Sequence, residues 1–129
     1  MIPLALPIDA SLPSSFIITS WNASSLLSRG PAVQLYLHHY RPSILIIIEP
    51  RIQHTHDIQQ HASYTSVHVQ HTHAHGGFVI YMHRSIVYQQ RHITTCTFDP
   101  ATASTIALFH ISSPQLAHSF LLIPVYMSC

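Results

Sequence analysis

Charge is the property that this sequence has least of. Charged residues make up 7% of the 129 residues, there is no lysine, and Glu49 is the single glutamate. About 25% charged residues is ordinary for a globular protein. The formal net charge of +1 gives little long-range attraction for nucleic acid or for an anionic membrane. Thirteen histidines supply much of the remaining polarity, and so few charges predict poor solubility near neutral pH.

Cysteines and long apolar runs are also scarce. Cys96 and Cys129 are far apart and form no C-x-x-C pair, so neither a disulfide framework nor a cysteine-ligated zinc site is indicated. We expect two free thiols in a reducing compartment. No apolar run approaches the roughly 18 residues of a membrane helix, and the opening "MIPLALPIDASLP" has three prolines and no basic residue, unlike a signal peptide. We therefore expect an intracellular protein, cytoplasmic or nuclear, that does not use a membrane as partner.

The first half of the chain predicts a strand, a helix and a second strand. Residues 1–14 suggest an irregular lead-in, and "SFIITSW" (15–21) is β-branched and aromatic, as in a buried strand. Gly30-Pro31 breaks the next segment, so we expect a helix over 31–40 that begins at the proline. The run "SILIIIE" (43–49) is apolar on both faces, which is typical of a central strand covered on each side. A strand-helix-strand unit of this length predicts two parallel strands.

The second half predicts mainly strands. Residues 51–75 are polar, with a short strand at "YTSVHV", and a turn is expected around Pro114. Further strands are expected at 76–83, 85–95, 104–113 and 118–126. A βα unit followed by a series of strands predicts an α/β layered protein with a mixed sheet.

Four motifs occur in a definite order. They are "SWNASSLLSR" (20–29), "RPSILIIIEPR" (41–51), "HGGFVIYMH" (75–83) and "LLIPVYMS" (121–128). Together they resemble the amino-terminal half of the endonuclease/exonuclease/phosphatase (DNase I-like) family, and are most similar to the endonuclease domains of non-LTR retrotransposons. The chain departs from the family pattern at Ser43, Ile48 and Pro50, where the family has aspartate, glutamine, and threonine or serine.

The resemblance implies a four-layer α/β sandwich that cleaves DNA phosphodiester bonds with the help of Mg²⁺ or Mn²⁺. It implies that Glu49 ligates the metal, that Asn22 positions the metal or a phosphate oxygen, and that Tyr126 approaches the scissile phosphate. These residue types suit that chemistry, because Mg²⁺ keeps several waters and needs only one or two carboxylates. The edge of an α/β sheet at which strands end is also where ligands of such folds bind.

The later motifs of this family, G-D-x-N and S-D-H, are absent from the 129 residues. Those motifs carry the groups that activate water and stabilise the transition state, and Asp9, Asp57 and Asp99 lie in no matching context. We therefore expect residues 15–129 to be a partial domain, truncated before its second half and inactive alone.

Each of the three implied site residues also has a purely structural interpretation. Glu49 could be a solvated residue at the end of a core strand, and Asn22 a turn residue that caps the next segment. Tyr126 could be a core aromatic with its hydroxyl at the surface. The glycine pair 76–77 favours a special backbone conformation over a phosphate cradle, since no G-x-G-x-x-G or Walker pattern follows.

The tract "HVQHTHAHGG" suggests a different function, a metal-binding module. His71, His73 and His75 alternate, so a strand would place all three on one face. Imidazoles suit Zn²⁺, Ni²⁺ or Cu²⁺, although no H-E-x-x-H or Cys/His framework accompanies them. A dedicated site at these histidines is therefore the weaker alternative, compositional drift in a variable loop explains the tract better, and adventitious Zn²⁺ or Ni²⁺ binding is expected. A third alternative is a non-functional open reading frame whose apolar strands, with few charged residues around them, promote aggregation. No G-x-S-x-G motif supports nucleophilic catalysis.

Overall fold

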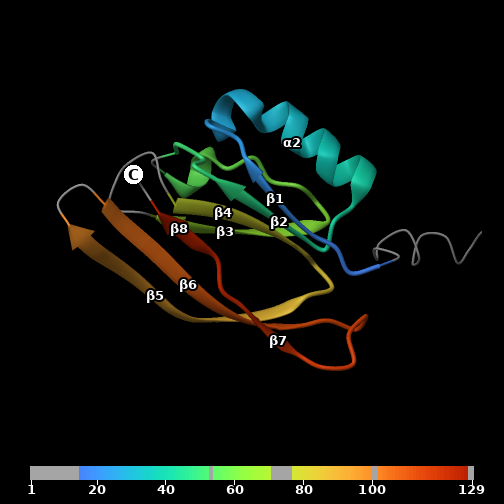
Figure 1. The fold of residues 1–129 in the computed structure, drawn as a ribbon. Helices are drawn as coiled ribbons and strands as arrows, with labels where there is room; N and C mark the ends of the chain where they lie inside the picture. Colours follow the sequence, from blue (N-terminus) through green and yellow to red (C-terminus); the bar gives the residue numbers. More distant parts are fainter. Residues whose placement is uncertain (1–14, 53, 71–76, 100–101, 128–129) are drawn as a thin grey trace, which may run out of the picture.

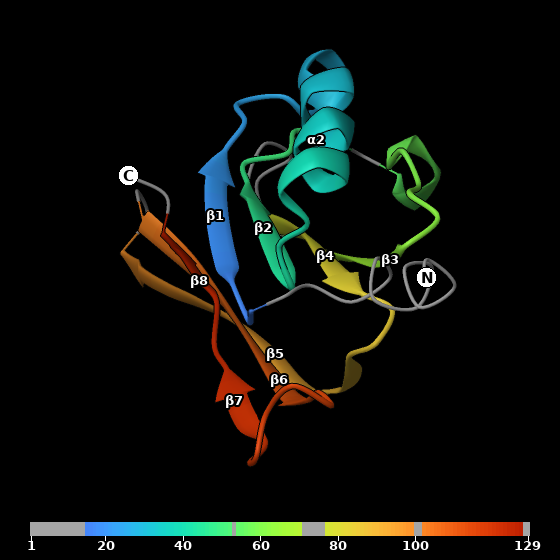
Figure 2. The same ribbon diagram turned by 90° about the vertical axis from the view of Figure 1, so that its right-hand side faces the viewer.

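The fold has three layers (Figures 1 and 2). The α-helix packs on one face of a first β-sheet, and a second β-sheet packs on the opposite face of that first sheet. The computed structural model describes residues 15–52, 54–70, 77–99 and 102–127, with the side chains of 92–99, 102–104 and 127 left out. The expected lead-in (1–14), Gly76, the His71/His73/His75 tract and the thiols of Cys96 and Cys129 lie outside the described part.

The first sheet, sheet A, is mixed. It contains β1 (Ile18–Asn22), β2 (Ile44–Ile48), β3 (Tyr64–Gln70) and β4 (Gly77–His83), in the order β1-β2-β4-β3. β1 and β2 are parallel, as the strand-helix-strand pattern predicts, and the other two pairings are antiparallel. The expectation of an α/β protein with a mixed sheet is therefore confirmed.

β2 is buried on both faces, as its unbroken apolar run predicts. Leu45 and Ile47 belong to the core between sheet A and the helix, whereas Ile44 and Ile46 belong to the core between the two sheets. Successive side chains of a strand point to opposite faces, so one apolar run supplies both cores.

The helix begins earlier than the sequence predicts. α2 spans Leu26–Tyr40, and Pro31 lies inside it. A proline there removes one backbone hydrogen bond and crowds the preceding turn, but the buried face outweighs this cost. Leu26, Gly30, Val33 and Leu37 recur at helical spacing and are buried, and the three apolar side chains among them pack against sheet A. The expectation of a helix start at Pro31 was wrong because tertiary packing overrides that local signal.

Gly30 allows the helix to approach the loop that precedes β3. A Cβ atom built on Gly30 would lie 3.0 Å from the side-chain oxygen of Gln59. The residue that suggested a helix break is thus a point of close packing.

The second sheet, sheet B, is antiparallel throughout its described part. It contains β5 (Val87–Asp99), β6 (Thr102–Ser112), β7 (Phe120–Leu122) and β8 (Val125–Met127). The expected strand over 118–126 is divided into β7 and β8, which pair with β6 in one continuous register. Pro124 lacks the N–H that the ladder needs, although its carbonyl still accepts a hydrogen bond from the Ala107 N–H (3.1 Å).

A short 3₁₀ helix, η2 (Thr55–Asp57), lies in the connection between β2 and β3. Among the described residues, no helix combines the length and the apolarity needed to cross a bilayer.

Candidate functional site

The carboxyl ends of β1 and β2 lie side by side. Asn22, the last residue of β1, is the Cα partner of Ile48, the last residue of β2. The Ala23 N–H donates to the Ile48 carbonyl (3.2 Å), which extends the pairing by one residue. Glu49 follows directly, so two of the three predicted site residues come from neighbouring strand ends. In Figures 1 and 2 the arrowheads of β1, β2 and β8 all point to this end of the molecule.

Glu49 has an unusual backbone. Its φ of 53° lies in the left-handed region, which costs a residue with a Cβ roughly 1–2 kcal/mol. Its N–H donates to the carbonyl of Gly77 (3.3 Å), and the next carbonyl, that of Pro50, accepts from the N–H of Leu26 at the start of α2 (2.7 Å). β4 and α2 therefore hold the half-buried Glu49 in place, and such strained residues are often found at functional sites.

Gly77 supports the structural interpretation of the glycine pair. It opens β4 with a φ of 92°, a conformation that favours glycine. In the described structure Gly77 provides the positive-φ backbone at the start of β4, a special backbone conformation that the sequence predicts.

Asn22 caps a turn. Its side-chain oxygen accepts a hydrogen bond from the N–H of Ser24 (3.1 Å), and Ser24 has a φ of 60°. This matches the structural interpretation of Asn22, and it limits the functional one. Because the oxygen serves the turn, the exposed side chain is better suited to donate from its amide group to a phosphate oxygen than to ligate a metal.

Tyr126 reaches the same end of the molecule from the other sheet. It lies in β8, and its ring meets that of Phe78 edge to face, with centroids 6.3 Å apart. Phe78 is the Cα partner of Ile48, the residue before Glu49. Tyr126 is half-buried in the core between the sheets, so it combines the packing role expected of a core aromatic with a position near the strand end.

Glu49 offers a carboxylate at this edge, which is a type of ligand that hard divalent cations take. Within the described ranges, no three His, Cys, Asp or Glu side chains gather closely enough to hold a metal ion together. A divalent ion at Glu49 would therefore take most of its ligands from water and phosphate oxygens, a coordination that Mg²⁺ commonly adopts.

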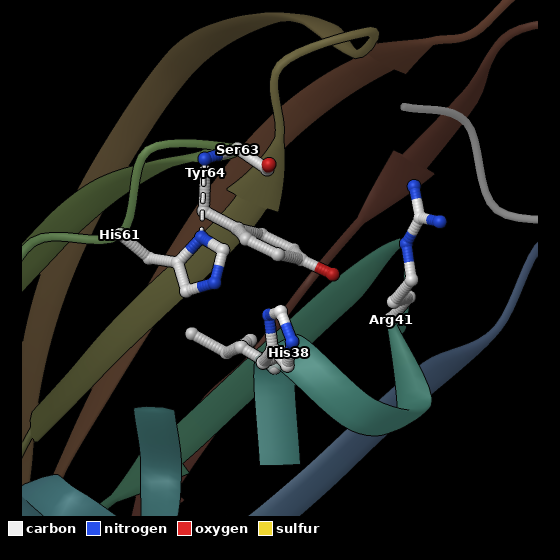
Figure 3. Close-up of a pocket in the computed structure, with 6 residues that line it drawn as sticks. His38, Arg41, His61, Ser63 and Tyr64 are labelled. Carbon is white, nitrogen blue, oxygen red and sulfur yellow. Dashed lines mark hydrogen bonds between the residues drawn. The ribbon is translucent and has the colours of Figure 1, made fainter. Parts of the chain in front are cut away.

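The structure also contains a pocket that the sequence did not indicate. A cavity of about 340 Å³ lies where α2 ends and β3 begins, lined by Leu37, His38, Arg41, His61, Ser63 and Tyr64 (Figure 3). It lies at the opposite end of sheet A from Glu49, because α2 runs back from the end of β1 to the start of β2. Its residues come from two segments that share no recognisable motif.

A second hollow, of about 390 Å³, lies along the exposed edge of sheet A and has an aromatic lining. The rings of Tyr36 and Tyr40 are 4.9 Å apart, and the Tyr36 hydroxyl contacts Thr19 Oγ1 in β1 (3.2 Å). Trp21, from the Trp-Asn motif, packs near Tyr36. In the described structure this tryptophan joins the helix to the edge strand.

Comparison with known proteins identifies no relative of this chain among protein-family models or curated sequences. No protein-family model matches the chain, and no curated protein matches its sequence.

Proposed function

We propose that the end of sheet A at Asn22 and Glu49 is the first part of a metal-dependent phosphodiesterase site, of the DNase I-like type found in retrotransposon endonucleases, with DNA as its substrate. The observation that carries this proposal is the meeting of Asn22, Glu49 and the Tyr126–Phe78 pair at one end of the two sheets. These are the positions at which the sequence resembles the family.

The chemistry divides among the three residues. The Glu49 carboxylate holds Mg²⁺ or Mn²⁺, which when bound offsets charge on the phosphoryl oxygens. The Asn22 amide donates a hydrogen bond to a phosphate oxygen and thereby orients it. The Tyr126 hydroxyl, at the end of β8, borders the phosphate from the side of sheet B.

The layers support the same assignment. A helix, a mixed sheet and a second sheet make up three of the four layers of a DNase I-like sandwich. The outer face of sheet B carries Val87, Leu121 and Val125, which are 71%, 55% and 50% exposed. Such apolar residues suit a face that a fourth layer covers.

The proposal covers binding of metal and phosphate and stops short of cleavage. The 129 residues contain neither G-D-x-N nor S-D-H, so the general base and the transition-state donors of the family have no counterpart here. We expect a purified chain to bind divalent metal without nicking supercoiled plasmid above background in Mg²⁺. Nicking that Glu49→Ala abolishes would contradict this expectation.

Glu49→Gln is expected to weaken Mn²⁺ binding about tenfold or more, because an amide replaces the only charged ligand while the size of the side chain is kept. Paramagnetic broadening of amide NMR signals measures this directly. Mn²⁺ should broaden the signals of Asn22, Ala23 and Gly77 in the wild type and leave those of Tyr64 sharp. Asp57→Asn, which removes a carboxylate on η2, should behave as the wild type.

The histidine tract requires its own control, because His75 precedes Gly77 by two residues and Gly77 contacts Glu49. A variant with His71, His73 and His75 replaced by alanine should retain broadening around Glu49. If this variant loses the broadening and Glu49→Gln keeps it, the ion belongs to the histidines and the proposed site is wrong.

A further inference from the structure

The pocket at the end of α2 is bordered by hydrogen-bond donors and positive charge. Of its lining side chains, Arg41 carries a permanent charge, and His38, His61 and Ser63 can each donate a hydrogen bond. None of the lining residues is acidic. This composition is complementary to an anion with several oxygens.

His61 is fixed as a donor toward the cavity. Its Nδ1 accepts a hydrogen bond from the backbone N–H of Ser63 (3.0 Å), so the neutral ring carries its proton on Nε2. Figure 3 shows this second nitrogen turned to the side of His38, whose ring centroid lies 6.5 Å away. Burial, and to a lesser extent the nearby His38, lowers the pKa of His61, which favours the neutral ring.

The same hydrogen bond argues against a metal at this histidine pair. A ligating Nε2 must be unprotonated, which places the proton on Nδ1. That proton would face the N–H of Ser63, which needs an acceptor. His61 is therefore better suited to bind an oxyanion than Zn²⁺ or Ni²⁺.

Arg41 borders the pocket from the other side. It ends α2 with a φ of 51°, and its N–H donates to the carbonyl of Leu37 (3.2 Å). In Figure 3 its guanidinium stands beyond the hydroxyl of Tyr64, which is occupied in donating to the Pro42 carbonyl (2.6 Å). The His61 ring and the Arg41 guanidinium thus lie on two sides of the Tyr64 ring.

A second arginine, Arg84, holds the turn beside the pocket. The Arg84 Nε donates to the carbonyl of Ala62 (2.6 Å), and the backbone N–H of Arg84 donates to the carbonyl of Ser63 (3.0 Å). These contacts hold the Ala62–Ser63 turn in place beside the cavity. The rim of the pocket is therefore fixed by hydrogen bonds to a neighbouring turn.

We propose that this pocket binds the phosphate group of a small phosphorylated molecule. Its volume of about 340 Å³ exceeds what one phosphate ion needs and lies within the range of small-molecule sites. The Arg41 guanidinium supplies the positive charge for the phosphate, and the His61 Nε2–H donates to the ligand from the other side of the pocket. The site is independent of the proposed phosphodiesterase edge, since it occupies the opposite end of sheet A.

The test is an NMR titration with inorganic phosphate at constant ionic strength, followed by a sugar phosphate and the same sugar without phosphate. We expect saturable shifts at the amides of His38–Arg41 and Ala62–Tyr64, tighter binding of the sugar phosphate than of phosphate, and no response to the free sugar. Equal affinity of phosphate and sugar phosphate, or a response to the free sugar, would contradict a pocket for a phosphorylated molecule.

Two variants locate the site. Arg41→Asn removes the guanidinium but tolerates the left-handed backbone, and should weaken phosphate binding about tenfold or more. Arg51→Asn is its matched control, because Arg51 has a similar φ of 53° and the same charge, and it should change affinity less than about twofold. In His61→Asn the side-chain oxygen can still accept from Ser63, while the ring donor is lost, so this variant should also weaken binding.

Three further results would overturn the proposal. They are the absence of saturable phosphate binding, an equal loss in Arg41→Asn and Arg51→Asn, and saturable Zn²⁺ binding at the same amides that His61→Asn abolishes. The last result would assign the pocket to a metal.

Discussion

Phe109→Ala is expected to lower the free energy of unfolding by about 3–5 kcal/mol, the usual cost of removing a buried phenylalanine ring. Phe109 is 0% exposed in β6, in the core between the two sheets. Its ring packs against that of Tyr88, with centroids 6.2 Å apart. Small domains have only about 5–15 kcal/mol of stability in total, so this variant should be close to unfolding.

Urea denaturation followed by circular dichroism measures the loss. Leu121→Ala is the matched control, because Leu121 lies on β7, opposite His110, the residue after Phe109, and is 55% exposed. This control should cost about 0.5 kcal/mol or less. A loss below about 1 kcal/mol for Phe109→Ala would mean that sheet B does not pack on sheet A as described. The absence of any cooperative transition in the wild type would instead favour the product of a non-functional reading frame.

Raising the pH from 10 toward 12 is expected to destabilise the fold through two buried tyrosines. Burial raises the pKa of Tyr64 and of Tyr81 from 10.0 to about 12. Their hydroxyls donate to the carbonyls of Pro42 (2.6 Å) and Gln59 (2.9 Å). The loss of either proton would leave a phenolate facing a carbonyl oxygen.

The sign follows from linkage. Each folded-state pKa is raised, so the stability from each neutral tyrosine is fully present below pH 10 and is lost as the pH rises from 10 toward 12. At pH 11 the loss amounts to about 1.4 kcal/mol for each tyrosine, or about 3 kcal/mol together. Denaturant melts between pH 8 and 11 measure it.

Tyr64→Phe and Tyr81→Phe separate the two contributions. Each variant should be less stable than the wild type at pH 8, because a buried carbonyl loses its donor. Each should also show a shallower decline above pH 10, because one titrating group is gone. A decline that is unchanged in both variants would assign the alkaline transition to other groups.

The sequence predicted the centre of sheet A because the relevant signals are local. The run from Ile44 to Ile48 is too apolar for a surface strand, and its spacing from the preceding strand and helix allows only a parallel partner. The sequence signals for where the helix begins were less reliable. Pro31 and Gly30 suggest a helix start when only their neighbours are considered, whereas the early start is stabilised by contacts with sheet A and Gln59.

The two candidate sites differ in the same way. The family resemblance implied that Asn22 and Glu49 lie together, and the parallel pairing of β1 and β2 accounts for their placement, because parallel strands end at a common edge. The pocket of His38, Arg41 and His61 could not be predicted, since it depends on where the end of α2 meets a polar loop with no regular spacing. Thirteen histidines scattered along the chain gave no reason to select these two.

The two-sided burial of β2 makes the two cores cooperative. Withdrawing this strand would expose Leu45 and Ile47 on one side and Ile44 and Ile46 on the other, and would break its pairing with both β1 and β4. Neither core can therefore open while the other stays intact around β2. Five consecutive residues couple the helix layer to sheet B, so the three layers should unfold as a single unit.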